Sequence, residues 1–522
     1  MVLARDGIVC TSQPLAAFAG AEVLRTGGNA IDAAVATVAV LGVVEPFMTG
    51  VGGDCFMLIW DAAARSLYGL NGSGRAPRSA TQSAITERGH RAMPTHGMLA
   101  VTVPGAVDAW SEALLRCGTR SLGQVLEAAI HYAEDGFAVS EIVAQQWRSA
   151  ATSLQTPEGQ RAFMPGGRVP ELGQVVRFPA LARTLRALAD GGRDVFYRGE
   201  LARAIADCSR THGGFLDEVD LAEHNSTWVD PISVDYRGLQ VCELPPNGQG
   251  LTALLAFNIL ECFDLRALAA DARAHLQIEA IKLAFADRNR WIADPQHAHV
   301  PVTALLSKEY ARERAALIRP EQAAERVGPG APPPGSDTVY VTAADRAGNV
   351  VSLINSLYMP FGSGMVAGET GIALQNRGCA FSLDLAHPNC IAPRKRPFHT
   401  IIPAMLLRDG RPLVSFGVVG RDMQAQGHVQ VVQHLVDGDC NVQEAIERPR
   451  FNFLGGRRVA LEAPLEASVG AALARRGHDV ADEAAAVPYS NFGGAQAIVI
   501  DPATGAYWGA SDPRKDGCAI GF

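Results

Sequence analysis

Apolar residues recur along the chain with two different periods, and their alternation predicts a mixed α and β fold. A helical spacing marks residues 16–25 and 30–44, and Asn29 stands at the N-cap position of the second helix. Short apolar runs then predict strands over residues 55–60 and 66–70. The chain therefore begins with two helices followed by a β-hairpin.

The middle of the chain is mainly helical in pattern. Periodic Leu, Ala and Val predict helices through residues 121–217 and 251–293, with a hairpin over 227–244 between them. Residues 328–336 are rich in proline and glycine, which excludes a helix or a central strand and predicts an exposed connector. This connector divides the chain into two parts.

Strand patterns predominate after the connector, and helical patterns alternate with them. The strands are predicted over residues 337–342, 350–355, 400–407, 413–418 and 495–500, and the helices over 426–435, 442–447 and 465–476. This order favours an α+β fold in which stacked, mainly antiparallel sheets are covered by outer helical layers.

Composition and charge narrow the class of protein. The 522 residues are 48% hydrophobic and 19% charged, which suits a large packed core and excludes a disordered chain. The net charge of −8, without a basic cluster, argues against a nucleic-acid partner. The longest apolar stretch, residues 33–44, is too short to span a membrane. The N-terminus also carries no apolar signal core, so we expect a cytoplasmic protein.

Thr338 stands out among the candidate catalytic residues because it follows the connector directly, at the start of a predicted strand. A chain break before it would give this threonine a free α-amine, which can serve as the base that activates its hydroxyl. Threonine is also common at strand edges for purely structural reasons. The ten cysteines are dispersed without a CxxC pair, and phosphate-loop, HExxH and GxSxG motifs are absent.

The surrounding motifs resemble the γ-glutamyltranspeptidase family of N-terminal-nucleophile hydrolases over essentially the whole chain. The resemblance rests on ordered motifs that include GGNAIDAA at 27–34, EP at 45–46, GVGG at 50–53, VPG at 103–105, DYRG at 235–238, FADR at 285–288, DT at 337–338, KRP at 395–397 and GASDPR at 509–514.

The resemblance implies an αββα sandwich made as a precursor that cleaves itself between Asp337 and Thr338. Chains 1–337 and 338–522 would then form one interdigitated heterodimer, and whether heterodimers pair further is left open. It also implies that Thr338 first attacks the carbonyl of Asp337 and later a substrate amide, which gives an acyl-enzyme that passes to water or an amine. It implies no metal or organic cofactor.

Further site residues follow from the same resemblance. Ser356 stands where the family has a second threonine that hydrogen-bonds the nucleophile. Gly420 and Arg421 stand where two glycines offer backbone N–H groups to the oxyanion, a role that a side-chain change at Arg421 can preserve.

The substrate-binding positions depart from the family pattern. Ser73 and Gly74 replace the usual arginine and glutamate, and Ala380 replaces the aspartate that would pair with an α-amine. Arg75, Arg377 and Arg421 are candidates for binding a substrate carboxylate instead. The predicted substrate-binding residues are Arg75, Tyr358, Arg377, His399 and Thr400.

The leading hypothesis from the sequence is therefore a self-processing hydrolase or transferase of γ-glutamyl amides such as glutathione. The first alternative is an acylase or amidohydrolase of the same fold that acts on another acyl group, such as a glutaryl group, a cephalosporin side chain or an oxamate-like small amide. The second alternative is a binding protein that never cleaves.

Overall fold

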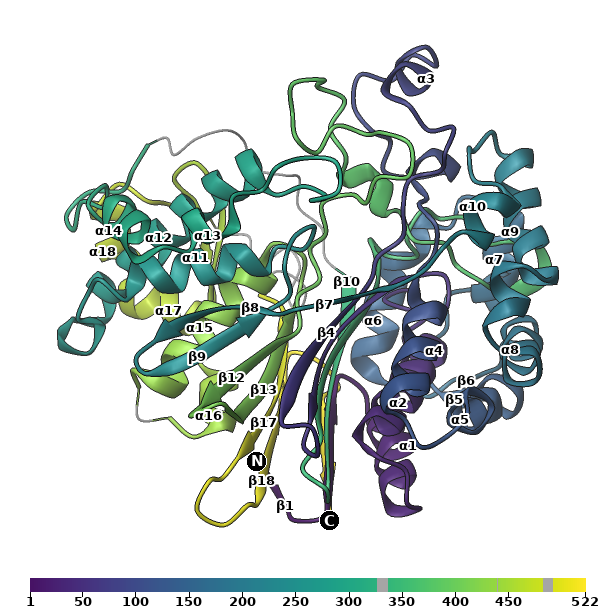
Figure 1. Ribbon diagram of the computed structural model, residues 1–522, viewed down its shortest axis with the longest axis horizontal. Helices are drawn as coiled ribbons and strands as arrows, with labels where there is room; N and C mark the ends of the chain where they lie inside the picture. Colours follow the sequence, from purple (N-terminus) through teal and green to yellow (C-terminus); the bar gives the residue numbers. More distant parts are fainter. Residues whose placement is uncertain (326–336, 439, 482–491) are drawn as a thin grey trace.

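The computed structural model describes residues 1–325, 337–438, 440–481 and 492–522 of the chain. Two seven-stranded antiparallel sheets lie face to face in the described part, and helices cover the outer face of each sheet (Figure 1). The predicted α+β class and the αββα sandwich are confirmed. No helix within the described ranges is long and apolar enough to cross a membrane.

Each sheet is assembled from strands that lie far apart in the sequence. The first sheet contains, in spatial order, β1 (Val2–Ala4), β18 (Tyr507–Ser511), β17 (Gly494–Ile500), β13 (Arg411–Val419), β12 (Ala404–Arg408), β9 (Leu239–Glu243) and β8 (Ile232–Tyr236). The second contains β19 (Cys518–Gly521), β2 (Gly7–Thr11), β10 (Asp337–Asp345), β11 (Val350–Tyr358), β3 (Asp54–Asp61), β4 (Ser66–Gly72) and β7 (Thr227–Val229). Residues on both sides of the predicted cleavage point therefore belong to both sheets.

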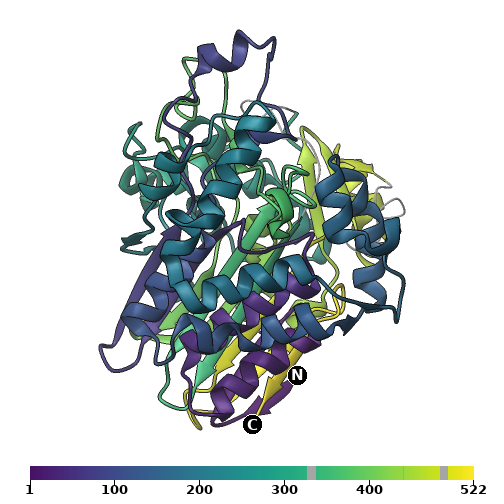
Figure 2. The ribbon, with the colours of Figure 1, turned by 90° about the vertical axis from the view of Figure 1, so that its right-hand side faces the viewer.

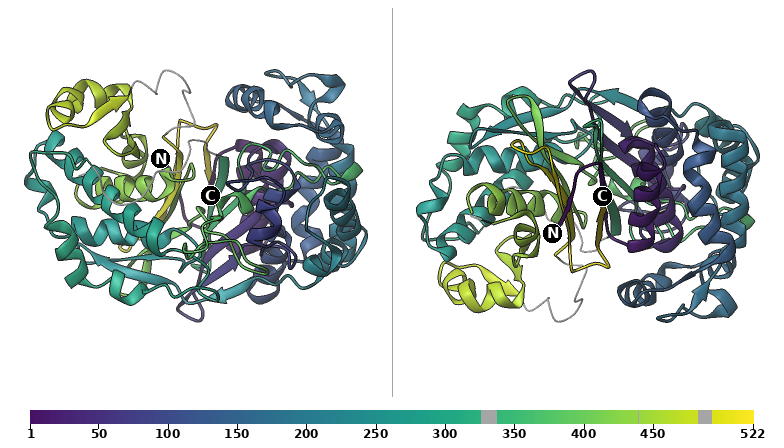
Figure 3. Two further views of the ribbon diagram at one scale, coloured as in Figure 1. Left: turned by 90° about the horizontal axis from the view of Figure 1, so that it is seen from above. Right: turned by 90° about the horizontal axis from the view of Figure 1, so that it is seen from below.

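The outer helices form two separate layers, which the views from above and below show on opposite sides of the sheets (Figure 3). The second sheet is covered by α1 (Pro14–Arg25), α2 (Ala30–Val44), α4 (Ala106–Cys117), α5 (Leu122–Asp135), α6 (Glu141–Ala150), α7 (Pro157–Phe163), α8 (Pro179–Tyr197), α9 (Glu200–Thr211) and α10 (Glu218–Ala222). Figure 2 shows this layer from its outer side. The first sheet is covered by α11 (Gly250–Leu260), α12 (Ala270–Trp291), α13 (Val302–Leu305), α14 (Lys308–Ala315), α15 (Met423–Val436) and α16 (Val442–Glu447).

Apolar side chains fill three layers of core. One cluster lies between α1, α2, α5 and α8 and the second sheet, and another lies between α11, α12 and α15 and the first sheet. A third cluster lies between the two sheets and includes Phe56 of β3, Tyr340 of β10 and Ile354 of β11. Because side chains alternate along a strand, Asp54, Thr338 and Ser356 face the same inter-sheet layer as these three residues.

Most predicted elements agree with the structure, and two differ for physical reasons. The hairpin predicted over 227–244 is present as β8 and β9, which pair across the turn at 237–238, but residues 227–229 form the separate strand β7, which joins the second sheet. The predicted helix 465–476 is broken into α17 (Ala463–Leu465), a π-helical turn at Glu466–Gly470 and α18 (Ala471–Arg475). The predicted connector 328–336 lies outside the described residues.

Smaller elements lie around the sandwich. A short sheet is made of β14 (Phe451–Gly455), β15 (Arg458–Leu461) and β16 (Asp479–Ala481), and β5 (Phe137–Ala138) pairs with β6 (Val175–Val176). The short helix α3 (Gln82–Thr86) lies at the top of the view in Figure 1. The two chain termini lie side by side, where the N–H of Arg5 donates to the carbonyl of Phe522 at 3.0 Å.

Candidate active site

The candidate site lies at one end of the second sheet, where three neighbouring strands each present a polar residue. Thr338 is the second residue of β10, Ser356 lies near the end of β11, and Asp54 is the first residue of β3. Ser356 pairs directly with Asp54 in the β11–β3 register. These three residues form a polar row on the inter-sheet face, at the end of a layer that is otherwise apolar.

A β-bulge brings the first two members of this row together. Asp337 pairs with Tyr358 but Val339 pairs with Asn355, so two residues of β11 oppose the single Thr338. Bulges of this kind redirect a side chain and are common beside active sites. The Thr338 and Ser356 hydroxyl oxygens lie 3.0 Å apart, and Thr338 is only 2% exposed. The predicted partnership of these two hydroxyls is therefore present in the geometry.

Two N–H groups of other residues donate to the Ser356 hydroxyl and define how it is used. The backbone N–H of Tyr358 donates to Ser356 Oγ at 2.8 Å, and Arg377 Nη2 donates to it at 3.3 Å. Since neither donor can accept, the Ser356 oxygen accepts from both and keeps its own hydrogen to donate. Thr338 Oγ1 lies within hydrogen-bond distance of Ser356 Oγ and can accept this hydrogen. The arrangement favours a hydrogen bond that runs from Ser356 to Thr338.

Two arginines pack against the ring of Tyr358 beside these hydroxyls. The guanidinium carbons of Arg377 and Arg421 lie 4.0 and 4.5 Å from the ring centroid, and Arg421 Nη2 donates to the Tyr358 hydroxyl at 2.8 Å. Arg377 Nη1 donates to Thr400 Oγ1 at 2.8 Å. Arg377 is fully buried, and burial lowers its pKa to about 10. The side chains of Tyr358, Arg377, Thr400 and Arg421 thus form one cluster with Ser356.

This arginine pair retains unused hydrogen-bonding capacity. Arg377 Nε and Arg421 Nη1 are buried and have no hydrogen-bond partner in the described structure. The polar contacts of both guanidiniums within the described ranges are to hydroxyl groups. A buried guanidinium is costly unless its charge and N–H groups are satisfied. A carboxylate bound here could neutralise the positive charge of the site and accept hydrogen bonds from these two N–H groups.

The backbone at Gly420 and Arg421, the two residues predicted to offer N–H groups to an oxyanion, is unusual in conformation. Gly420 has a φ of 120° and Arg421 a φ of 52°, both in the left-handed region that side chains disfavour. The Gln249 amide fixes this turn, because its Nε2 donates to the carbonyls of Thr400 and Arg421 at 2.7 and 2.8 Å. Arg288 in turn donates to Gln249 Oε1 at 3.2 Å. These contacts anchor the carbonyl of Arg421 to the segment that carries Thr400.

Asp54 and His399 form a buried pair beside the cluster. Asp54 Oδ2 lies 3.0 Å from His399 Nε2, while Oδ1 accepts from the N–H groups of Gly74 and Gly105 at 3.1 and 3.2 Å. Burial raises the pKa of Asp54 from 3.8 to about 7. Burial also lowers the pKa of His399 well below 6.5, so the imidazole is neutral and its Nε2–H donates to the carboxylate.

The structure separates one predicted residue from the others and adds two that the sequence did not single out. Arg75 donates to the carbonyl of Arg394 and lies 3.7 Å from an Asp294 oxygen, and neither of these contacts belongs to the cluster around Thr338. Asp54 and Gln249 were missed. The polar residue that directly follows the glycine run 50–53 and begins an apolar strand was a signal for Asp54. Nothing local marks Gln249.

Comparison with known proteins gives a consistent result. Residues 16–522 match the family model described as gamma-glutamyltranspeptidase. The chain is 38% identical to the glutathione hydrolase-like YwrD proenzyme of Bacillus subtilis, covering 100% of this chain and 99% of that protein. It is 38% identical to the oxamate amidohydrolase proenzyme of Klebsiella pneumoniae, covering 99% and 98%. It is 36% identical to the acylase ACY 1 proenzyme of Pseudomonas sp., covering 98% and 93%.

A solved structure extends the likeness to three dimensions. The cephalosporin acylase from Bacillus halodurans superposes with a TM-score of 0.93 at 45% identity, covering 100% of this chain and 96% of that one. Fold and site together therefore define an enzyme of the N-terminal-nucleophile hydrolase class. The chain belongs to the gamma-glutamyltranspeptidase family. The resemblance predicted from the motifs is confirmed, and the alternative of a binding protein without enzymatic activity is not supported.

Proposed function

We propose that this enzyme is a self-processing amide hydrolase and acyltransferase that uses Thr338 as its nucleophile and acts on amides whose acyl group carries a carboxylate. γ-Glutamyl amides such as glutathione are the leading substrates. The observation that carries the proposal is the buried pair Arg377 and Arg421, which lies beside the Thr338–Ser356 hydrogen bond and has N–H groups without partners.

Self-processing begins with attack of Thr338 Oγ1 on the carbonyl carbon of Asp337. The Asp337–Thr338 peptide bond breaks as an ester forms on the threonine oxygen, and the proton of the hydroxyl passes to the departing nitrogen. Water then hydrolyses the ester, which leaves a carboxylate on Asp337 and a free α-amine on Thr338. The bulge at Thr338 supports this step, because it takes the nucleophile out of regular strand pairing.

In turnover the α-amine of Thr338 takes the hydroxyl proton as the oxygen attacks the substrate amide. The proton then passes to the leaving amine, and the acyl group stays on Thr338 until water or a second amine removes it. Ser356 donates to the nucleophile and orients it. The backbone N–H groups of Gly420 and Arg421 stabilise the negative charge on the carbonyl oxygen.

The acyl group is selected by charge in this proposal. Arg377 Nη2 contacts Ser356, which itself contacts Thr338. A substrate carboxylate bound by this guanidinium would therefore be separated from the reacting carbonyl by only a few covalent bonds of the acyl group. Charge-assisted hydrogen bonds of this kind contribute about 1.5–3 kcal/mol each. Tyr358 keeps the two guanidinium planes apart and in position.

A second candidate is an amidohydrolase of acyl groups that carry a carboxylate but no ammonium group. The observation that favours it is the engagement of the neighbouring carboxylates. Asp54 already accepts three hydrogen bonds, and Asp422 accepts from Arg288 at 2.5 Å. Ala380 stands where the family carries an aspartate. A relative named oxamate amidohydrolase and one named acylase are in keeping with this candidate.

A matched set of anilides tests both candidates on the processed enzyme. γ-Glutamyl and glutaryl anilides differ only in the α-ammonium group, and butyryl anilide lacks the carboxylate as well. We expect the two carboxylate-bearing substrates to exceed the butyryl compound in kcat/KM by about 100-fold or more. Equal rates for glutaryl and butyryl anilides would disprove a carboxylate requirement. Release of glutamate from glutathione, and the γ-glutamyl to glutaryl ratio, decides between the two candidates.

The proposal extends to assembly and cellular location. Cleavage gives a heterodimer of chains 1–337 and 338–522, and light scattering of the processed protein measures whether heterodimers pair. A cytoplasmic location is supported by the ten cysteines, all of which are free thiols in the structure. Cell fractionation tests that location directly.

A further inference from the structure

A second polar cluster lies among the helices that cover the first sheet, between α12, the segment 319–324 and the turn that follows α18. It consists of His275, Glu279 and Lys282 of α12 together with His478, and is called here the α12 cluster. His275, Glu279 and His478 are 0%, 2% and 4% exposed. None of these residues takes part in the amide chemistry proposed above.

We propose that His275, Glu279 and His478 form a binding site for one divalent transition-metal ion, of which zinc is the best-matched kind. His275 and Glu279 are four residues apart and therefore lie on the same face of α12. His478 approaches them from the other side. One ligand atom from each of the three lies within 4.8 Å of the others. Two imidazole nitrogens and one carboxylate oxygen are a donor set that zinc uses in proteins.

The distances are close to those that a tetrahedral ion requires. His275 Nδ1 lies 2.8 Å from His478 Nε2, and His478 Nε2 lies 3.9 Å from Glu279 Oε1. Ligand atoms about 2.0–2.1 Å from a tetrahedral zinc are roughly 3.4 Å apart. The two imidazoles would separate by about 0.6 Å and the carboxylate would approach by about 0.5 Å. Side-chain adjustments of this size need no change of the backbone.

Backbone groups hold the outer atoms of two of the ligands. His275 Nε2 lies 2.8 Å from the carbonyl of Arg319, so this nitrogen carries the hydrogen and the Nδ1 lone pair faces the cluster. Glu279 Oε2 accepts from the N–H of Ala324 at 3.2 Å, which leaves Oε1 for the cluster. Metal ligands are characteristically oriented by such contacts to their outer atoms. His478 presents Nε2 to the cluster, and its outer nitrogen Nδ1 is buried without a hydrogen-bond partner, so only two of the three ligands have such support.

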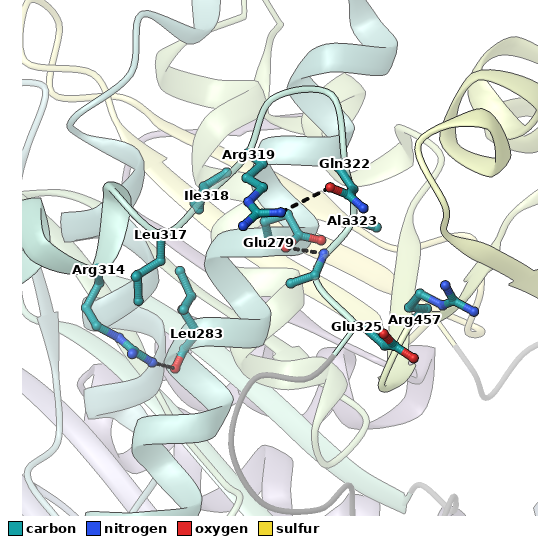
Figure 4. A pocket seen from close by; sticks show the side chains of 11 residues that line it. Glu279, Leu283, Arg314, Leu317, Ile318, Arg319, Gln322, Ala323, Glu325 and Arg457 are labelled. Carbon is teal, nitrogen blue, oxygen red and sulfur yellow. Dashed lines mark hydrogen bonds between the residues drawn. The ribbon is translucent and has the colours of Figure 1, made fainter.

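Access to the cluster is provided by a pocket of about 590 Å³ (Figure 4). Glu279 lines this pocket, together with Arg319 and Gln322 of the segment that holds His275. In the close-up, the Glu279 carboxylate lies beside that segment, and a hydrogen bond joins Arg319 to Gln322. An ion and its remaining water ligand can therefore reach the carboxylate from the pocket side.

Lys282 is the residue that competes with the proposed ion. Its Nζ lies 2.7 Å from Glu279 Oε1, the oxygen that the ion would use. It also lies 3.4 Å from the carbonyl of Ala324 and 5.9 Å from the ring centroid of Phe453. These two neighbours give the ammonium group a place when the ion takes the carboxylate. The lysine should therefore weaken metal binding and not prevent it.

Direct titration of the chelator-treated protein with Zn²⁺ or Co²⁺ tests the proposal. We expect one ion per chain by calorimetry and the visible absorption of tetrahedral cobalt. His275→Gln and His478→Gln should each weaken binding by about 100-fold or more. Lys282→Met should tighten it by about tenfold or more, because a positive charge beside the ion is removed.

Controls separate this site from other histidines and from the catalytic proposal. Exposed His131, which pairs with Asp135 on α5, is the matched control, and His131→Gln should leave binding unchanged. Glu279→Gln provides a near-isosteric variant in case a histidine variant fails to fold. Absence of binding by both the natural protein and Lys282→Met at about 1 mM metal would overturn the proposal, as would binding that survives both histidine variants.

The site would join the two chains that the proposed processing creates. His275 and Glu279 lie before residue 337 and His478 lies after it. This consequence alone rests on the proposed function, so Thr338→Ala provides the distinction. An uncleaved precursor that binds the ion with unchanged affinity supports the metal site whatever the outcome of the processing test.

Discussion

Two pairs of arginines in this enzyme, one fully buried and one with Arg514 partly exposed, have opposite surroundings. Arg450 donates to Asp512 at 2.7 Å and to the carbonyls of Phe492 and Ile446 at 2.9 Å each. Arg514 donates to the other oxygen of Asp512 at 3.1 Å and forms an ion pair with Glu462. Arg450 and Arg514 therefore each have a carboxylate partner within the protein.

The pair at the candidate active site has no carboxylate as a direct hydrogen-bond partner among the described residues. Arg377 and Arg421 contact hydroxyl groups and the face of Tyr358, and each retains an N–H group without a partner. A buried charge that the protein itself neutralises contributes to the folded structure, whereas one left open costs stability and is available to a ligand. The difference is in keeping with a structural role for Arg450 and Arg514 and supports the proposal that Arg377 and Arg421 bind the substrate.

The largest expected effect separates chemistry from stability at the site itself. Thr338→Ala removes the hydroxyl, so we expect an uncleaved chain and a loss of amide hydrolysis of about 1000-fold or more. Intact mass and the rate with a carboxylate-bearing anilide measure both effects. Thr338→Ser keeps a hydroxyl and should still process. Cleavage between Asp337 and Thr338 in the alanine variant would show that another group is the nucleophile.

The second-largest effect is expected on the free energy of unfolding, at Arg450 of the pair that has carboxylate partners. Arg450→Met leaves Asp512 buried with fewer partners, and we expect the free energy of unfolding to fall by about 3–5 kcal/mol. Urea unfolding, measured in the Thr338→Ala background so that a single chain unfolds, gives this value. A loss below about 1 kcal/mol would contradict the assignment of this pair to stability.

Arg377→Met should show the reverse pattern. We expect its kcat/KM ratio between glutaryl and butyryl anilides to fall by about 100-fold, because only the first substrate carries a carboxylate. The ratio cancels the effect of losing the contact with Ser356, which both substrates share. The free energy of unfolding should fall by less than in Arg450→Met, since Arg377 donates no hydrogen bond to a carboxylate in the described structure and only its longer-range attraction to Asp54 is lost. An unchanged ratio would remove Arg377 from substrate recognition.

The smallest effect is a pH dependence at Asp54. Burial raises the pKa of this carboxyl group from 3.8 to about 7, so the folded protein holds the proton more tightly than the unfolded chain. Its contribution to stability is therefore complete below about pH 4 and is lost as the pH rises toward 7.

Comparison of the natural chain with Asp54→Asn isolates this contribution. The variant should gain stability relative to the natural chain between about pH 4 and 7, by an amount on the order of a few kcal/mol. His399 works in the opposite direction, because burial lowers its pKa, but it is present in both proteins. Urea unfolding at several pH values measures the difference. A difference that does not change with pH would show that Asp54 keeps its ordinary pKa.

Much of the fold could be predicted from the spacing of apolar residues. Helix α2 (Ala30–Val44) begins and ends at the predicted residues, because Asn29 caps it and its N-terminal turn is closed by Asp32. Strands β10 and β11 begin at the predicted residues as well. The prediction was wrong where local pattern and packing disagree, as in residues 465–476, which a π-helical turn interrupts.

The candidate site was predicted only in part. Thr338 and Ser356 followed from their position after the connector and from the family motifs, and the structure places their hydroxyls in contact. Arg75 and Arg377 were equal candidates in the sequence, and the structure places only Arg377 in contact with Ser356. Asp54 was missed because its partner, His399, is 345 residues away.

The sequence by itself determined which segments form helices and strands, the family of the enzyme and the residue proposed as nucleophile. These properties depend on local periodicity or on ordered motifs, both of which the chain carries in its linear order. Only the tertiary structure decided which buried charges are neutralised and which remain open. That distinction depends on which distant side chains lose water together, and contacts such as Asp54–His399 and Arg377–Ser356 exist only once the two sheets have packed.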